Sequence, residues 1–166
     1  MLKPGFEKQV SFEEPRRGEE SDILVSLKIR ARIRFDYRGK ARPSRFFVGG
    51  KGTADAAGEL REQQAALWRN VPVQGIYIEN IEMGEIYTVY DEDAEGEVAF
   101  APLELEVVAD TLSFLVRFAV RDEFRRLKIM EPARISMTVQ EMEQIFFEVH
   151  HQSKTQVMQK VKRYTD

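Results

Sequence analysis

Apolar residues occupy every odd position between Ile23 and Tyr37, while the even positions from Ser26 onward are polar and mostly basic. Because successive side chains of a β-strand point to opposite faces, this pattern predicts one long strand with an apolar face and a basic face. At about 3.3 Å per residue such a strand would extend over about 50 Å. The sequence therefore predicts a sheet that is organised around this strand.

A second region of alternation begins at Gly75. Ile76 and Ile78 share one face, but the apolar positions change parity at Asn80. A change of parity is typical of a β-bulge or a tight bend, in which an extra residue redirects the following side chains. The pattern allows two strands or one bent strand in this region.

The polar run at 91–96 predicts a hairpin loop, and apolar residues alternate again after it. Their parity changes beyond Pro102. Proline cannot donate a hydrogen bond to a neighbouring strand, so we expect this segment to be an edge strand or to carry a bulge at Pro102. A further short strand is expected around Leu127 and Ile129.

Two helices are expected in the middle of the chain. Thr53 is a candidate N-cap for a helix that runs to about Arg69. Asp110 is a candidate N-cap for a second helix, from Thr111 to about Phe124, which is apolar on nearly all sides. A helix of that kind is buried or lies at an interface.

The last helix has the clearest start signal. Thr138 and Glu141 have the spacing of a capping box, and apolar residues continue at helical spacing from Val139 to Tyr164. These elements together predict an α+β fold, a largely antiparallel twisted sheet with helices packed mainly on one face. We expect residues 1–20 to form a mobile N-terminal arm and residues 21–166 to form a single domain.

The composition limits the class of protein. With 166 residues, of which 43% are hydrophobic, the chain can bury a core without disulfides or metal. It has no cysteine, which excludes disulfides, thiolate metal sites and a cysteine nucleophile. No apolar run approaches the roughly 20 residues of a membrane helix, and residues 1–15 lack the apolar centre of a signal peptide. We therefore expect a cytoplasmic protein without membrane contact.

No motif indicates an activity. The glycine-rich loop at 49–53 lacks the P-loop spacing, because Gly52 separates the lysine from the threonine. His150 and His151 are the only histidines, and neighbours on a helix point about 100° apart, so they cannot share a metal ion. We predict no catalytic residue, metal or cofactor. We interpret the chain as a non-enzymatic module that binds a protein partner or itself. A weaker alternative is an enzyme whose site is not visible as a motif.

The net charge of −3 is unevenly distributed, with +6 on residues 1–52, −12 on residues 53–110 and +3 on residues 111–166. A basic strand could follow a phosphate backbone, so nucleic-acid or other polyanion binding is the alternative function. The candidate residues are Lys28, Arg30, Arg32, Arg34, Arg38, Lys40, Arg42 and Arg45. The basic face lacks the aromatic residues that single-strand readers use for stacking. Acidic residues in the later strands offer cross-strand partners instead, so we favour paired arginines.

Self-association is the expected form of assembly. The last helix would be about 39 Å long, which exceeds the diameter of a small domain, and its second half has too narrow an apolar stripe to be stable alone. We expect a homodimer in which two such helices pack antiparallel about a two-fold axis. The predicted contact residues are Phe147, Val157, Val161 and Tyr164.

Overall fold

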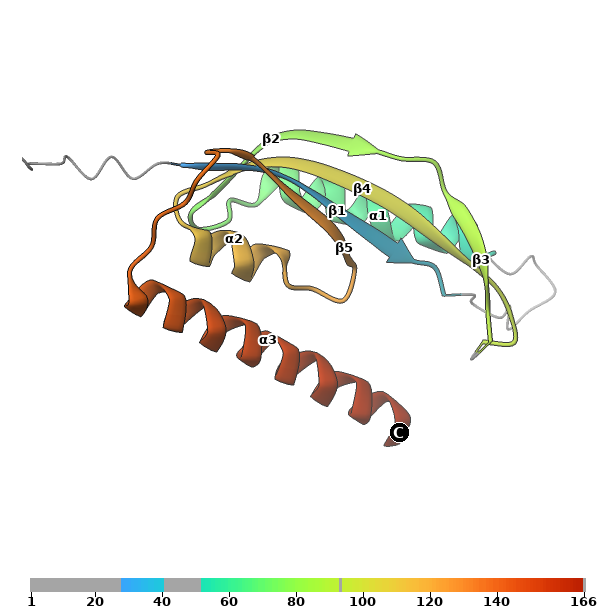
Figure 1. Cartoon of the computed structure of the whole chain (residues 1–166). Coiled ribbons are helices and arrows are strands. Elements are labelled where there is room, and N and C mark those ends of the chain that lie inside the picture. Colours follow the sequence, from blue (N-terminus) through green and yellow to red (C-terminus); the bar gives the residue numbers. More distant parts are fainter. Residues whose placement is uncertain (1–27, 41–51, 93, 166) are drawn as a thin grey trace, which may run out of the picture.

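The computed structural model describes residues 28–40, 52–92 and 94–165, with the backbone alone for 159–165. The described residues form five strands and three helices (Figure 1). In chain order these are β1 (Ile29–Arg38), α1 (Thr53–Asn70), β2 (Ile76–Met83), β3 (Tyr87–Asp91), β4 (Gly96–Ala109), α2 (Leu112–Ala119), β5 (Phe124–Glu131) and α3 (Val139–Thr165). The N-terminal arm, the first part of the predicted long strand and residues 49–51 of the glycine-rich loop lie outside the described residues.

All strand pairs are antiparallel, and the sheet has the order β2-β4-β1-β5, with β3 paired to the first part of β4. β1 therefore lies between β4 and β5. Ile33 shows this arrangement, because it is in register with Leu105 on one side and with Leu127 on the other. The predicted α+β class and the antiparallel sheet are confirmed.

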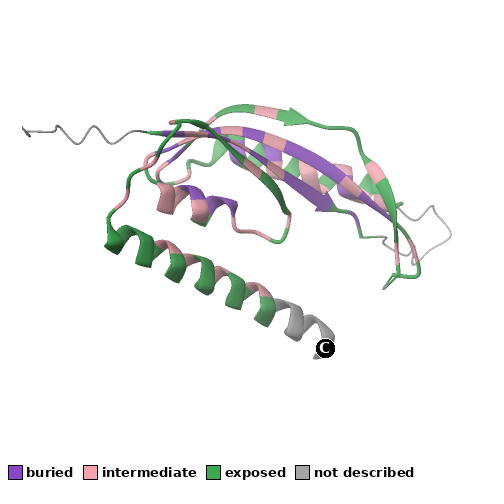
Figure 2. Ribbon diagram, in the orientation of Figure 1, coloured by how far each residue is buried: buried purple, intermediate pink, exposed green. Residues whose placement is uncertain are grey.

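The apolar face of the sheet forms the core, and α1 and α2 both pack on it (Figure 2). Ile33, Phe35 and Leu105 are fully buried there. Phe118 of α2 joins the two helices to the sheet, because its ring meets Phe35 edge-on at 6.0 Å and Trp68 of α1 at 5.1 Å between centroids. The helices thus cover one face of the sheet, as predicted.

The alternation along the described part of β1 and the bulge in β2 are also confirmed. Ile29, Ala31 and Ile33 are buried, whereas Arg30 and Arg32 between them are half-buried on the other face. In β2 the register with β4 shifts between residues 78 and 80, where the parity of the apolar positions changes.

The prediction that Pro102 lies on an edge strand or at a bulge is wrong. β4 pairs with β1 on one side and with β2 and β3 on the other, and its register with β1 continues unbroken through Asp36 and Pro102. The carbonyl of Pro102 accepts a hydrogen bond from the amide of Gly84 at 3.1 Å, so its nitrogen faces the same side. Proline is tolerated in this central strand because the side on which it lacks an N–H group faces the break between the end of β2 and the start of β3.

The start of α1 differs from the prediction by one residue. Thr53 is the first helical residue, and the cap is Gly52, which makes no side-chain hydrogen bond. Ala57, Ala65 and Trp68 are the buried residues of this helix. Leu67 is exposed although it adjoins the buried Trp68, because neighbouring residues on a helix point about 100° apart.

The second helix is shorter than predicted and is capped by Thr111 instead of Asp110. The Thr111 hydroxyl accepts a hydrogen bond from the amide of Phe114 at 3.3 Å. The helix ends at Ala119, and Phe124 begins β5 in register with Phe35. Pairing with β1 outweighs the helical spacing of the last apolar residues.

The capping box of α3 is confirmed. The Thr138 hydroxyl accepts a hydrogen bond from the amide of Glu141 at 3.2 Å, and the Glu141 carboxylate accepts one from the amide of Thr138 at 2.7 Å. The hydrogen bonds that the amide and the hydroxyl of Thr138 donate to the Glu141 carboxylate hold the pKa of Glu141 below its usual value. In Figure 1, α3 lies beyond α2, which separates it from the sheet, and its main contact is with α2.

Candidate functional site

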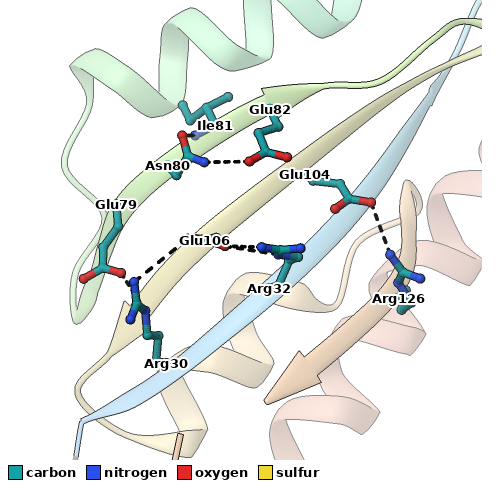
Figure 3. A network of polar contacts seen from close by, with 9 residues as sticks. All are labelled: Arg30, Arg32, Glu79, Asn80, Ile81, Glu82, Glu104, Glu106 and Arg126. Atoms are coloured by element: carbon teal, nitrogen blue, oxygen red, sulfur yellow. Dashed lines mark hydrogen bonds and ion pairs between the residues drawn. The ribbon is translucent and has the colours of Figure 1, made fainter. Parts of the chain in front are cut away.

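The charged face of the sheet consists of the side chains that alternate with the core residues of β1, β4, β2 and β5. Among the described residues no helix packs on this face. Arg32 lies directly opposite Glu106 in the register of β1 and β4, and its guanidinium forms an ion pair and hydrogen bonds with that carboxylate (Figure 3). The hydrogen bond from Arg32 lowers the pKa of Glu106.

Neighbouring arginines reach carboxylates on either side. Arg30 Nε lies 2.9 Å from Glu79 of β2, at the bulge. Arg126 of β5 extends across β1 to Glu104 of β4, with a distance of 3.2 Å between the nitrogen and the oxygen (Figure 3). The bulge residue Glu79 is thus the carboxylate that Arg30 contacts most closely.

Asp36 forms the centre of a second polar cluster, which the sequence analysis did not identify. It accepts hydrogen bonds from Arg34 Nε at 2.8 Å and from the Tyr87 hydroxyl at 2.6 Å, and Arg125 Nε lies 3.3 Å away. The Tyr87 ring stacks on Phe100 with centroids 5.6 Å apart. Burial and the bond to Asp36 raise the pKa of Tyr87. The only sequence signal was the acidic residue at the end of a basic stripe.

A surface depression of about 420 Å³ lies over this cluster. Three guanidinium groups line it, and all three have carboxylate partners, because Arg34 and Arg125 contact Asp36 while Arg126 contacts Glu104. Two carboxylates, Asp36 and Glu104, thus offset most of the charge of the three guanidinium groups.

The residues predicted for polyanion binding are paired wherever the structure shows them on the sheet. Lys28 lies 3.9 Å from Asp110, and Arg38 lies 2.6 Å from Asp91. Arg30, Arg32 and Arg34 have the partners described above. Lys40 is exposed, and Arg42 and Arg45 lie outside the described residues. Paired arginines agree with the interpretation favoured in the sequence analysis.

α3 has two distinct faces within its described side chains. Its half-buried residues recur at helical spacing and form the face toward α2: Ile145, Glu148, Gln152 and Gln156. Three of these four side chains are polar. The apolar residues of α3 are consequently left for the most part on its outer surface (Figure 2).

We call one set of exposed residues the apolar seam, namely Val139, Met142, Phe146, Val149 and Val157. The first four are spaced three, four and three residues apart, as in the a and d positions of a coiled coil. The Phe146 side chain is 69% exposed although it is large and apolar. The seam is therefore a candidate interaction surface.

The residues predicted for the dimer interface fall on this helix. Phe147 and Val157 are 67% and 59% exposed, and the Phe147 ring stacks on His151 at 6.2 Å between centroids. Phe147 lies about 100° around the helix from Phe146, beside the seam. Val161 and Tyr164 belong to α3, but their side chains are outside the described part. The sequence analysis did not assign Val139, Met142, Phe146 or Val149 to the interface, although their three-and-four spacing was the available signal.

In the described residues no group of three or more histidine, aspartate or glutamate side chains is placed to hold a metal ion. The described helices include none that is long and apolar enough to cross a membrane.

No protein-family model matches the sequence. No curated protein matches it either.

Proposed function

We propose that the protein is a non-enzymatic module that assembles with itself, with two copies pairing through antiparallel α3 helices. The observation that carries the proposal is the apolar seam, which leaves Phe146 and its neighbours in contact with water on a helix whose inner face is mostly polar. Burying apolar surface of this kind is the usual driving force of association. We expect the assembly to be cytoplasmic.

The charge along α3 supports a second copy as the partner. Residues 139–152 carry three glutamates and no lysine or arginine, whereas residues 153–165 carry four basic residues and no carboxylate. In an antiparallel pair, the acidic half of each helix lies beside the basic half of the other. A parallel pair would place like charges together, which is unfavourable at the flanks of a coiled-coil seam.

Analytical ultracentrifugation over a range of protein concentrations tests self-association. We expect a concentration-dependent dimer for the unmodified chain and a monomer for Phe146→Ser, because the substitution removes the largest side chain of the seam. Tyr90→Ser is the matched control, since Tyr90 of β3 is also 69% exposed but lies far from α3 in the chain. A monomer at every concentration contradicts the proposal, and so does a dimer that Phe146→Ser leaves intact.

The orientation can be tested separately because the chain has no cysteine of its own. Ser153 lies near the middle of α3, so the two copies of this residue approach each other in an antiparallel pair. Ser153→Cys is therefore expected to form an intermolecular disulfide on mild oxidation, because its Cα atoms can approach within the 4.4–6.8 Å that a disulfide requires. Met142→Cys, near one end of the helix, is expected to remain reduced. A disulfide at Met142→Cys as well as at Ser153→Cys would indicate a parallel pair, because every residue of a parallel pair lies beside its own copy.

A further inference from the structure

A cleft of about 500 Å³ lies where α2, the connection from α1 to β2, and α3 meet. Its apolar walls include Val73, Phe114 and Phe118, and its polar groups include Arg117, Arg121 and Gln152. Clefts of about 300–1,000 Å³ with apolar walls and a few polar groups are typical of small-molecule sites. This cleft lies on the helical side of the sheet, away from the charged face.

Local features of the chain build the wall of the cleft. Gly75 has a φ of +68°, and a Cβ atom at this position would lie 2.3 Å from the Phe114 ring. Glycine therefore allows the ring to pack directly on the backbone at the start of β2. The hydrogen bond that the amide of Phe114 donates to the Thr111 hydroxyl fixes the first turn of α2 next to this contact.

The two arginines of the cleft differ from those of the charged face. Across the described residues, neither Arg117 nor Arg121 forms an ion pair with a carboxylate, and Glu123 acts on Arg121 only from beyond ion-pair distance. Arg121 Nε donates to the carbonyl of Phe118 at 2.8 Å, and its guanidinium lies over the rings of Trp68 and Phe118 at 4.6 and 5.1 Å. Burial lowers the pKa of Arg121. A partly buried guanidinium without a carboxylate is costly unless another anion compensates its charge.

We propose that this cleft binds a small organic carboxylate with an apolar body, such as a medium-chain fatty acid. The carboxylate would accept hydrogen bonds from the guanidinium groups of Arg121 and Arg117, which match its geometry, and the apolar body would lie along Phe114 and Val73. The proposal does not depend on self-association, because the cleft faces the inner side of α3 and the apolar seam lies outside it.

Trp68 supplies a built-in signal for the test, because it is the only tryptophan of the chain and lies directly under Arg121. We expect octanoate to change the Trp68 fluorescence in a saturable manner. Acetate, which lacks the apolar body, and octan-1-ol, which lacks the charge, are expected to bind at least about tenfold more weakly, since loss of either contact corresponds to more than about 1.4 kcal/mol.

Substitutions identify the site. Arg121→Gln is expected to weaken octanoate binding by about tenfold or more, and Arg117→Gln to weaken it by less, because Arg117 is exposed. Arg125→Gln is the matched control, since its guanidinium also lies over a ring, Phe100 at 5.2 Å, but on the other face of the sheet. If Arg121→Gln does not fold, Arg121→Lys keeps the charge while removing the forked geometry, and the same loss of affinity is expected.

Three results would overturn the proposal. The first is the lack of a saturable signal up to about 10 mM octanoate, because a dissociation constant above that concentration is too weak for specific binding. The second is unchanged binding in the arginine variants of the cleft. The third is binding of inorganic phosphate as tight as that of octanoate, which would mean that charge alone is recognised. Phe146→Ser, used above as the monomeric variant, is expected to bind octanoate normally, so a failure of self-association can be told apart from a failure of the cleft.

Discussion

The Tyr87 hydroxyl donates a hydrogen bond of 2.6 Å to the carboxylate of Asp36, the one charged residue that is buried among the described residues. Three strands meet at this contact, because Asp36 belongs to β1, Tyr87 to β3 and Arg125 to β5. β1 and β3 have no ladder in common, since each pairs with β4. The polar cluster therefore links β1 directly to β3, which backbone pairing connects only through β4.

Removal of the Asp36 carboxylate is expected to be strongly destabilising. Asp36→Ala leaves Arg34 without its partner and should cost about 3 kcal/mol in the free energy of unfolding. Tyr87→Phe removes one hydrogen bond to a charged group and should cost about 1.5 kcal/mol. Urea unfolding measures both, and the double variant should cost less than the sum. Two fully additive effects would contradict the proposed coupling.

Substitutions of adjacent residues test which side chains of β1 point toward the core and which lie on the charged face. Ile29 is buried on the core face, so Ile29→Asp places an unpaired carboxylate in the core and should cost more than about 4 kcal/mol or prevent folding. Arg30 is half-exposed on the charged face, so Arg30→Ser should cost less than about 1 kcal/mol. Thermal melting compares the two variants. Equal losses of stability would mean that Ile29 and Arg30 have been assigned to the wrong faces of the strand.

The ion pairs of the charged face can be tested by charge reversal. Changing both Arg30 and Arg32 to glutamate should lower stability, because the new carboxylates lie beside Glu79 and Glu106. The unmodified protein is expected to show negligible retention on immobilised RNA or DNA at low salt. Tight retention that falls steeply with salt and disappears in the double variant would instead support polyanion binding.

The Arg32–Glu106 pair predicts a dependence of stability on pH. The pKa of Glu106 is lower in the folded protein than the value of about 4.3 for an unperturbed glutamate, so the folded state favours the ionised form. The ionised Glu106 therefore stabilises the folded protein fully above a pH of about 4.3, and this stabilisation is lost as the pH falls through the pKa of the folded state.

Melting temperatures measured from pH 7 to strongly acidic pH should differ between the unmodified protein and Glu106→Gln at neutral pH and converge in acid. Glu97→Gln, which removes an exposed carboxylate from the same strand, controls for the loss of one charge. A difference that stays constant with pH would contradict the assignment.

The sequence alone determined those features that depend on neighbours along the chain. The alternation in β1 assigned Ile29, Arg30 and Arg32 to their faces because a strand places successive side chains on opposite sides. The start of α3 followed from Thr138 and Glu141 because a capping box closes within one turn.

Only the tertiary structure decided which strands pair and what each side chain meets. Pro102 is tolerated on the central strand because β2 ends and β3 begins beside it, and no local pattern around Pro102 encodes that break. In the same way, Arg30 and Arg32 contact Glu79 and Glu106, while Arg121 has no carboxylate partner within the described chain. These differences arise from contacts between residues tens of positions apart, which the order of strands in the sheet creates and a periodic sequence pattern does not specify.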